Sequence, residues 1–487
     1  MGRSLATGWR SGLVAERPLR ILQVSTADAA GGAEKIAWNL FQAYRARGYG
    51  AWLAVGYKHS DDADVLLIRN HEVLGGWSCF WRGPHTRLQS LGGRVRGAWR
   101  LSRLAHRLDD HGRLRDTDRG VEDFRLPGAW RLLSLTPQPP DIVHCHNLHG
   151  GYFDLRALPW ISRQVPVILT LHDAWLLSGH CAHSFDCERW KTGCGHCPDL
   201  TIYPAVHRDG TDYNWRRKRK IYAESRLYVA TPSRWLMHKV EESMLAPGVV
   251  EARVIPNGVD LSVFHPSNRQ AVRAALGMPQ DLKVLLFVAN GIRQNIWKDY
   301  RTMRASVAKV AERMHGQGVL FIAMGEEAPP ERIGQAEVRF IPYQNDPETV
   351  ARYYQAADVY LHAARADTFP NTVLEALACG TPVVATAVGG IPGQVKGLGI
   401  AGCGLRNLGL NGYRMEEATG VLVAPGDVES MAEATMALLS NEPLGKRLGE
   451  NAAQDARQRF GLEAQVAMYL EWYRAILTRK NANYSTL

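Results

Sequence analysis

Short apolar runs rich in Val, Ile and Leu alternate with segments of helical spacing along most of the 487-residue chain. Runs such as VPVILTL and KVLLFVA are apolar on both faces, which is typical of parallel strands that helices cover on both sides. Strands that alternate with helices predict βαβ units. The expected strands are Ile21–Thr26, Ala51–Gly56, Asp141–Asn147, Val165–Leu171, Arg226–Thr231, Glu251–Ile255, Lys283–Ala289, Val319–Met324, Val338–Pro342, Val359–Ala363, Pro382–Thr386 and Gly420–Val423.

The turn sequence Pro256-Asn257-Gly258 separates two such series and therefore predicts two domains. We expect the α/β class, with two Rossmann-like doubly wound domains, at 18–257 and 258–458, facing each other across a cleft. Ligands of such sheets bind beyond the carboxyl ends of the strands. A last helix at 459–480 carries aromatic residues at helical spacing and is expected to pack back toward the first domain.

Composition and charge narrow the class of protein. With 46% hydrophobic residues the bulk of the chain is not disordered, and the net charge of +10 favours an acidic partner such as phosphate, nucleotide, nucleic acid or an anionic membrane. The first 20 residues contain no apolar core of a signal peptide. No uncharged apolar run approaches the ~20 residues that span a bilayer. We therefore expect a cytoplasmic protein.

A region at about 57–140 interrupts the alternation of strands and helices and is rich in Arg and Trp. Within it, Arg96, Arg100, Arg103 and Arg107 recur at helical spacing, downstream of Trp77, Phe80 and Trp81. A second basic cluster is Trp215–Lys220. A basic element with aromatic neighbours is typical of contact with an anionic membrane surface. The alternative is a solvated charged helix.

The segment ARADTFPNTVLEALACGTPVVATAVGGIP, residues 363–392, reads as strand end, loop, helix and strand. A helix beginning near Asn371, with Pro370 in its first turn and Gly380 at its end, would aim free N–H groups at an anion. Asp367 precedes that helix end and Glu375 lies eight residues later. Beside a phosphate, a carboxylate is useful only as an acceptor from hydroxyls, so sugar or ribose hydroxyls are its natural partners. The alternative is a capping Asp and a surface Glu.

This segment resembles the E-x7-E signature of retaining GT-B glycosyltransferases of family 4, with Asp367 in place of the first Glu. The resemblance extends to VIPNGVD at 254–260, GGAEKIAWNL at 31–40 and LTLHD at 169–173. DIVHCHNLHGGYF and HDAWLLSGHCAHSFDCERWKTGCGHCPDL are similar to a bacterial subgroup that builds exopolysaccharides of the colanic-acid type. The resemblance covers most of residues 20–475. It implies a GT-B fold and metal-independent, retaining transfer from a nucleotide-sugar donor to a saccharide or lipid-diphosphate-linked acceptor at the inner membrane face.

The resemblance also implies roles for individual residues. Glu375 would bind the ribose, and Asp367 would hold hydroxyls of the transferred sugar. In VANGIRQNIWKDY, Lys298 and Arg293 would neutralise the leaving diphosphate, although the spacing of Arg293 is one residue off. The expected catalytic residues are His172, Asp367, Glu375 and Lys298, and the expected donor site comprises Arg293, Lys298, Asp367, Thr368, Phe369, Pro370, Asn371, Thr372 and Glu375.

In the first domain, the resemblance places His172 beside the anomeric carbon, where it would make polar contact with the sugar; a structural histidine at a strand end is the alternative. His146 and His149 follow a neighbouring strand and are expected to shape the acceptor pocket. Gly31 and Gly32 follow the first strand, where glycine permits close approach of the backbone to a ligand. A plain tight turn is the alternative there.

Four of the eight cysteines, Cys181, Cys187, Cys194 and Cys197, have the spacing C-x5-C-x6-C-x2-C. A structural Zn²⁺ would order this loop, at about 178–200, beside the cleft; reduced thiols or disulfides are the alternatives. No cofactor is expected for catalysis. A sugar-nucleotide epimerase of GT-B fold and a non-catalytic nucleic-acid-binding protein are rival functions. Nucleic acid is not an expected partner, because no nucleic-acid-binding module is recognisable.

Overall fold

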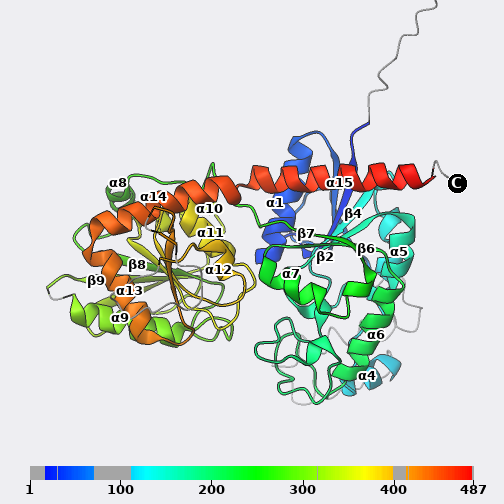
Figure 1. Cartoon of the computed structure of the whole chain (residues 1–487), viewed down its shortest axis with the longest axis horizontal. Coiled ribbons are helices and arrows are strands. Elements are labelled where there is room, and N and C mark those ends of the chain that lie inside the picture. Colours follow the sequence, from blue (N-terminus) through cyan, green and yellow to red (C-terminus); the bar gives the residue numbers. More distant parts are fainter. Residues whose placement is uncertain are drawn as a thin grey trace, which may run out of the picture.

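The computed structural model describes residues 17–29, 31–70, 111–314, 316–398, 413–414 and 416–484. They form two α/β domains, and each contains a seven-stranded sheet covered by helices (Figure 1). The strand orders are β3-β2-β1-β4-β5-β6-β7 and β10-β11-β9-β8-β12-β13-β14. Neighbouring strands are parallel except for the antiparallel pair β10 and β11. The predicted doubly wound fold class is confirmed.

The elements of the first domain begin and end close to the predicted positions. Its strands are β1 (Arg20–Ala27), β2 (Gly50–Tyr57), β3 (Val65–Leu67), β4 (Ile142–Cys145), β5 (Val167–Thr170), β6 (Leu227–Thr231) and β7 (Val249–Val254). Its helices are α1 (Gly32–Ala46), α4 (His111–Asp118), α5 (Leu158–Gln164), α6 (Thr211–Ala223) and α7 (Arg234–Glu241). Strand β3 was not predicted, because three residues are too short to show a periodicity.

The second domain has the same plan. Its strands are β8 (Lys283–Val288), β9 (Val319–Met324), β10 (Glu331–Ile333), β11 (Ala336–Ile341), β12 (Val359–His362), β13 (Val383–Thr386) and β14 (Gly420–Val423). Its helices are α8 (Arg269–Ala275), α9 (Tyr300–Arg313), α10 (Pro347–Ala356), α11 (Asn371–Ala378), α12 (Ile391–Gln394), α13 (Val428–Ser440) and α14 (Glu442–Arg459), and α15 (Leu462–Tyr484) follows. Strand β10 is another unpredicted short edge strand.

The strand order shows where each sheet can bind a ligand. In the first sheet the order reverses between β1 and β4, and in the second between β8 and β12. Crevices open at such points beyond the carboxyl ends of the strands. Gly31 follows β1, Lys298 follows β8 and Asp367 follows β12. Residues expected to bind ligand therefore lie at the switch points of both domains.

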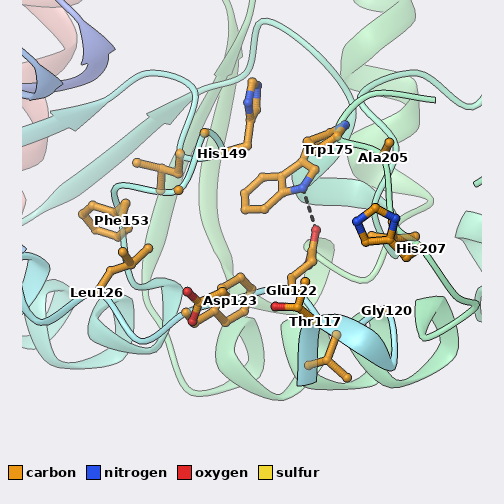
Figure 2. A pocket seen from close by; sticks show the side chains of 17 residues that line it. Thr117, Gly120, Glu122, Asp123, Leu126, His149, Phe153, Trp175, Ala205 and His207 are labelled. Atoms are coloured by element: carbon orange, nitrogen blue, oxygen red, sulfur yellow. Dashed lines mark hydrogen bonds between the residues drawn. The ribbon is translucent and has the colours of Figure 1, made fainter. Parts of the chain in front are cut away.

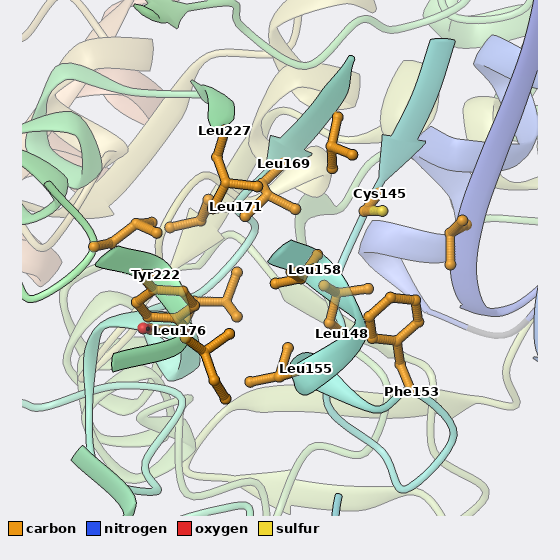
Figure 3. Packing of buried hydrophobic residues seen from close by; sticks show 14 of the residues in the cluster. Cys145, Leu148, Phe153, Leu155, Leu158, Leu169, Leu171, Leu176, Tyr222 and Leu227 are labelled. Carbon is orange, nitrogen blue, oxygen red and sulfur yellow. Dashed lines mark hydrogen bonds between the residues drawn. The ribbon is translucent and has the colours of Figure 1, made fainter. Parts of the chain in front are cut away.

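A buried apolar cluster supports the loops of the first domain (Figure 3). Cys145, Leu169 and Leu227 extend from neighbouring strands and pack with Leu158 of α5 and Tyr222 of α6. All of these side chains are at most 1% exposed. Truncating such a leucine to alanine costs ~2–5 kcal/mol, because the cavity does not fully collapse. This packing of buried side chains thus holds in place the strand ends that carry the site residues.

Helix α15 follows the second domain in sequence but packs on the first (Figure 1). The Tyr469 hydroxyl lies 2.8 Å from Thr170 Oγ1, and the Tyr473 hydroxyl lies 2.6 Å from His144 Nδ1. Trp472 Nε1 donates a hydrogen bond of 3.0 Å to Glu251. Since these aromatic side chains are buried against the first sheet, α15 ties the two domains together.

His144 makes the stability of this contact depend on pH. Burial lowers the pKa of His144 to about 3, so the folded chain keeps it neutral. In the unfolded chain a histidine binds a proton near pH 6.5, so stability is lost as the pH falls from there toward the folded pKa. By pH 5 this group alone should cost about 2 kcal/mol. We expect the free energy of unfolding, measured with denaturant, to depend on pH by about one proton less in His144→Gln than in the unchanged protein. An unchanged slope of this free energy against pH would contradict the prediction.

The structure describes only the second of the two basic segments, and that one is partly buried. Trp77, Phe80, Trp81 and the four arginines from Arg96 to Arg107 lie outside the described residues. Of the Trp215–Lys220 cluster on α6, Trp215 and Lys218 are buried rather than available to a membrane, because Lys218 pairs with Glu122 inside the domain. Arg216, Arg219 and Lys220 remain exposed. Among the helices of the described chain, none is long and apolar enough to cross a bilayer.

Candidate active site

The loops after β8 and β12 hold a lysine against a carboxylate. Lys298 forms a β-bridge with Ala364, and the Trp297 carbonyl accepts a hydrogen bond of 2.9 Å from the Arg365 amide. This pairing brings Lys298 Nζ into a direct ion pair with Asp367 Oδ2. Two residues that are far apart in sequence thereby form one charged site at the switch point of the second sheet.

The charge states of this site follow from its neighbours. Burial raises the pKa of Asp367, but the Lys298 charge and the His362 contact outweigh it and hold that pKa well below its usual range. His362 Nε2 lies 3.4 Å from Asp367 Oδ2, and burial lowers the pKa of His362 to about 4. Near neutral pH the site therefore contains an ionised carboxylate next to a neutral imidazole.

Two glycines in the turn after β13 allow that turn to lie close against the backbone of Asp367 and Thr368. Gly389 has φ of 54°, and a Cβ there would lie 1.8 Å from the Asp367 carbonyl oxygen. A Cβ on Gly390 would lie 1.9 Å from the carbonyl oxygen of Thr368. Neither position admits a side chain unless the backbone shifts. The Gly-Gly turn after β13 thus supports Asp367 and Thr368 from behind.

Helix α11 begins at Asn371, as predicted, and carries Glu375. Pro370 is the N-cap residue rather than part of the first turn, because its ψ of 124° is extended. Glu375 is 5% exposed, which excludes the alternative of a surface carboxylate. Its Oε1 accepts a hydrogen bond of 2.7 Å from Lys35 Nζ, and its Oε2 accepts one of 3.1 Å from the Tyr354 hydroxyl.

Lys35 is a partner that the sequence analysis missed. It lies on α1, within GGAEKIAWNL, and reaches across to the second domain. Burial lowers the pKa of Lys35, but the charge of Glu375 and its hydrogen bond outweigh burial and raise the pKa overall. The ammonium is therefore firmly charged. The only sequence indication was its position just after the two glycines of the first switch point.

The two domains meet directly around the predicted residues. Thr368 Oγ1 donates a hydrogen bond of 2.5 Å to the His172 carbonyl oxygen. Asn371 Nδ2 donates one of 3.1 Å to the Gly32 carbonyl oxygen. A cavity of about 300 Å³ opens beside these contacts. Its lining is Asp173, Ala182, His183, Tyr203, Asn295, Trp297, Lys298, Ala366, Asp367 and Thr368.

Asp367 and Glu375 line different cavities. Asp367 lines the 300 Å³ cavity with Lys298, whereas Glu375 lines a smaller one of about 80 Å³ with Lys35 and Asn371. The N-terminus of α11 lies between the two carboxylates in sequence, and its first N–H groups carry the positive end of the helix dipole. Thr368 lines the larger cavity and Asn371 the smaller one, so an anion at that helix end would lie at the border of both. This arrangement fits a ligand with hydroxyls at both ends and phosphates in the middle.

The histidines at the first-domain strand ends form a chain. His172 Nε2 lies 3.0 Å from His146 Nδ1, and His146 Nε2 lies 3.1 Å from Gln23 Nε2. Burial lowers the pKa of His172 to about 4, so its imidazole is neutral. His146 is buried, and neither His146 nor His172 is among the residues that line the 300 Å³ cavity. His149 instead pairs with Asp173 at 2.7 Å.

Arg293 is not brought to the lysine–aspartate pair. Its Nε donates a hydrogen bond of 2.5 Å to Glu326 Oε1, and its guanidinium lies over the Phe340 ring. The backbone amides of Ile292 and Arg293 also donate to Glu326. Arg293 is half-exposed and does not line the 300 Å³ cavity. Its shifted spacing in the sequence is therefore matched by a separate position in the structure.

Two thiols of the four-cysteine loop, those of Cys194 and Cys197, make separate contacts. Cys194 Sγ accepts a hydrogen bond from the Gly179 amide, and Cys197 Sγ lies 3.4 Å from His180 Nε2. Burial raises the pKa of Cys194 to about 12. Within the described residues, no three His, Cys, Asp or Glu side chains are placed to hold a metal ion. The zinc site stays a prediction from cysteine spacing, which metal analysis of the purified protein tests.

Two family models match consecutive parts of the chain. The model described as Glycosyltransferase Family 4 matches residues 30–263, and the model described as Glycosyl transferases group 1 matches residues 268–455. Between them they include every site residue that was predicted from the sequence. The chain belongs to the group 1 glycosyltransferases.

Two curated relatives agree with this family. WcaC of Escherichia coli, named as a colanic acid biosynthesis glycosyl transferase, is 26% identical over 258 residues, which cover 51% of this chain and 60% of WcaC. The D-inositol 3-phosphate glycosyltransferase 1 of Catenulispora acidiphila is 29% identical over 379 residues, which cover 74% of this chain and 79% of that protein. The match to WcaC thus spans less than two thirds of that relative.

Solved structures identify the fold as GT-B. Sucrose-phosphate synthase from Thermosynechococcus elongatus superposes with a TM-score of 0.59 and 19% identity, covering 95% of this chain and 100% of that one. Anabaena Alr3699/HepE in complex with UDP and glucose superposes with a TM-score of 0.55 and 16% identity, covering 93% and 98%. At these identities the likeness concerns the fold.

In this glycosyltransferase the cysteine-rich loop also contacts the second domain through aromatic rings. Phe185 stacks on Trp297, with ring centroids 5.5 Å apart and an angle of 6°. His183 stacks on Trp235 at 5.5 Å. The His183 Nδ1 accepts a hydrogen bond of 2.9 Å from the Phe185 amide, which leaves the proton on Nε2. That nitrogen is buried and has no hydrogen-bond partner among the described residues.

The Phe185–Trp297 stack should contribute to catalysis by keeping Trp297 and the adjacent Lys298 in place. Aromatic pairs are worth ~0.5–1.5 kcal/mol beyond their buried area. We therefore expect Phe185→Leu to lower kcat/KM for sugar transfer about 2- to 12-fold, the range that this energy corresponds to. Trp38→Leu, which disturbs the Trp38–Phe41 pair on α1, is the control. Equal losses in both variants would contradict a specific role for the stack.

Proposed function

We propose that this glycosyltransferase is a retaining, metal-independent enzyme that moves a sugar from a nucleotide-sugar donor to a saccharide acceptor. The observation that carries the proposal is the Lys298–Asp367 pair beside the N-terminus of α11, at the second switch point and opposite His172. HepE was solved with UDP-glucose, which supports a nucleotide-sugar donor for a chain of the same fold. The match to WcaC supports an acceptor in surface polysaccharide synthesis.

In the proposed reaction the bond between the anomeric carbon and the diphosphate oxygen breaks, and a bond to the acceptor oxygen forms on the same face of the sugar. Lys298 Nζ and the first amides of α11 hold the leaving diphosphate, because fixed positive groups stabilise charge best in a site that excludes water. The proton of the acceptor hydroxyl passes to the departing phosphate oxygen. These groups supply the charge stabilisation that a divalent cation supplies in other transferases.

The carboxylates would act on the two ends of the donor. Asp367, held ionised by Lys298, accepts hydrogen bonds from hydroxyls of the transferred sugar. Glu375 accepts hydrogen bonds from the ribose, for which its buried position and its contact with Tyr354 orient it. His172 is neutral and therefore contacts the sugar as a polar group, not as a cation.

A thermal-shift screen of UDP-, GDP- and ADP-sugars tests the donor class, because a ligand that binds only the folded state raises Tm. We expect a shift with one nucleotide series and release of the free nucleoside diphosphate only when an acceptor is present. No shift with any of them, in folded protein, would overturn the proposal. Isomerisation of the sugar without an acceptor would favour an epimerase instead.

We further propose that the acceptor is joined to a lipid diphosphate, so that the enzyme works as a peripheral protein at the inner face of the cytoplasmic membrane. The net charge of +10 and the exposed Arg216, Arg219 and Lys220 of α6 support this proposal. Flotation with anionic vesicles should show binding that falls with added salt, as screened attraction does. Equal binding to neutral vesicles would contradict it.

A further inference from the structure

A second cavity lies within the first domain, beside the active site but not part of it (Figure 2). Its volume is about 240 Å³. It is lined by the loop after α4, the loop after β4, Trp175 and the segment 204–207. A cavity of this size lies below the range of ~300–1,000 Å³ that drug-sized ligands need. It suits a single ring with its substituents.

Trp175 forms a rigid aromatic wall of this cavity. Its Nε1 donates a hydrogen bond of 2.7 Å to Glu122 Oε1, as the dashed line in Figure 2 shows. Lys218 Nζ lies 3.8 Å from the centre of the Trp175 rings, and His149 packs against them edge to face. An indole held on three sides loses no side-chain entropy when a ligand contacts it. Trp175 is 5% exposed, so a ligand would contact only the part of the indole that remains open to the cavity.

The cavity is kept open by glycine. Gly151 has φ of 74°, a conformation that favours glycine, and a Cβ at that position would meet no other atom within 4 Å. Gly150, with φ of 99°, precedes it on the same rim. At these two positions the loop after β4 contributes only backbone to the rim of the cavity.

The polar groups of the cavity select against phosphate. Among the described residues that line it there are two carboxylates, Glu122 and Asp123, two histidines, His149 and His207, and neither lysine nor arginine. His149 is already paired with Asp173. The buried Lys218 is already bound by Glu122 and by the carbonyl oxygens of Trp175 and Ser178. Carboxylates and backbone carbonyls accept hydrogen bonds from hydroxyls but repel anions. The ligand that fits is an uncharged saccharide.

The two cavities share no lining residue, but residues that line one contact residues that line the other. Asp173 and Tyr203 line the 300 Å³ cavity of the active site, here called the catalytic cavity. His149 and Pro204 line the second cavity. His149 binds Asp173 at 2.7 Å, and its Nδ1 lies 3.4 Å from the Tyr203 hydroxyl. The two cavities are therefore adjacent, separated by the side chains of His149, Asp173 and Tyr203.

We propose that the cavity is an acceptor subsite that binds an uncharged sugar residue next to the one that receives the transferred sugar. The subsite rests on the proposed glycosyl transfer and adds a requirement to it: the acceptor is at least a disaccharide. Trp175 contacts the apolar face of the bound residue, and Asp123 accepts hydrogen bonds from its hydroxyls. Acceptor length, and not only the reacting hydroxyl, then determines how well the enzyme selects its substrate.

Saturation-transfer NMR with maltose, cellobiose, lactose and the methyl glycosides of glucose, galactose and mannose tests the subsite. Ala205→Trp and His207→Trp place a large ring at exposed positions of the cavity lining, where the cost to folding is small. Arg208→Trp is the matched control, since Arg208 is exposed on the same segment but does not line the cavity. The Tm of each variant and its shift with the nucleotide-sugar donor are measured in parallel.

We expect at least one of these saccharides to bind the unchanged protein, with affinity reduced tenfold or more by Ala205→Trp or His207→Trp and retained in Arg208→Trp. The donor shift should be the same in all four proteins. Absence of saccharide binding to the unchanged protein, or equal binding by all the folded variants, would overturn the subsite. Absence of the donor shift would instead overturn the proposed transfer, so the two failures are distinguishable.

Discussion

Replacing Lys298 with methionine should lower the rate of sugar transfer by about 10²–10³-fold, the usual loss when one group that stabilises developing charge is removed. Among the described residues that line the catalytic cavity, Lys298 is the one lysine, and there is no arginine. In the proposed reaction the leaving diphosphate would then have only the amides of α11. Nucleoside diphosphate release in the presence of acceptor measures the loss.

The same substitution should destabilise the protein. Asp367 is held ionised within the site by Lys298, and removing one partner of a buried pair costs ~3–5 kcal/mol because the remaining charge is uncompensated. A lower Tm in Lys298→Met is therefore expected together with the lower rate. Loss of activity alone would then be ambiguous, because an unstable protein also transfers slowly.

The double variant Lys298→Met/Asp367→Asn separates these two effects. An uncharged amide next to an uncharged methionine leaves no buried charge, so we expect most of the lost Tm to return while transfer remains at least 10²-fold slower. If activity returned together with stability, Lys298 would have only a structural role. If neither returned, the loops after β8 and β12 would depend on this ion pair for their conformation.

The strands and the position of this site were predictable from the sequence, because both depend on local patterns. Continuous apolar runs locate β8 and β12, and residues at the carboxyl ends of strands beside a switch point must lie close together. That rule brings Lys298 to Asp367 across 69 residues of sequence. Likewise, Pro370 at its start and Gly380 at its end predict the helix that carries Glu375.

The contacts between the domains were not predictable, because no local pattern records them. Lys35 and Glu375 are 340 residues apart, and nothing in the helical spacing of α1 shows which of its polar residues faces the second domain. The Phe185–Trp297 stack joins an irregular loop to another loop, neither of which has a periodicity. The position of Arg293 was not predictable for another reason. Its positive charge suggested contact with a phosphate, but its guanidinium pairs with Glu326, which follows the neighbouring strand β9.

Glu375→Gln should weaken donor binding by about 10- to 150-fold, which corresponds to the ~1.5–3 kcal/mol of a hydrogen bond to a charged group. Glutamine preserves the size of the side chain and can still accept from the Tyr354 hydroxyl. It loses the negative charge, which strengthens the hydrogen bonds that the two ribose hydroxyls donate to this side chain. Titration of the nucleotide alone, followed by Tm or calorimetry, measures the change without requiring an acceptor.

Lys35→Met is the control that distinguishes ribose binding by Glu375 from a contact between the domains. Lys35 binds Glu375 Oε1 from the first domain, so Glu375→Gln also weakens a contact between the domains. If Glu375 binds the ribose, Lys35→Met should leave nucleotide affinity within about threefold, because Tyr354 still orients the carboxylate and one oxygen becomes freely available. If both variants lost affinity equally, the function of Glu375 would be to hold the domains together, and ribose recognition would have to come from other residues of the second domain.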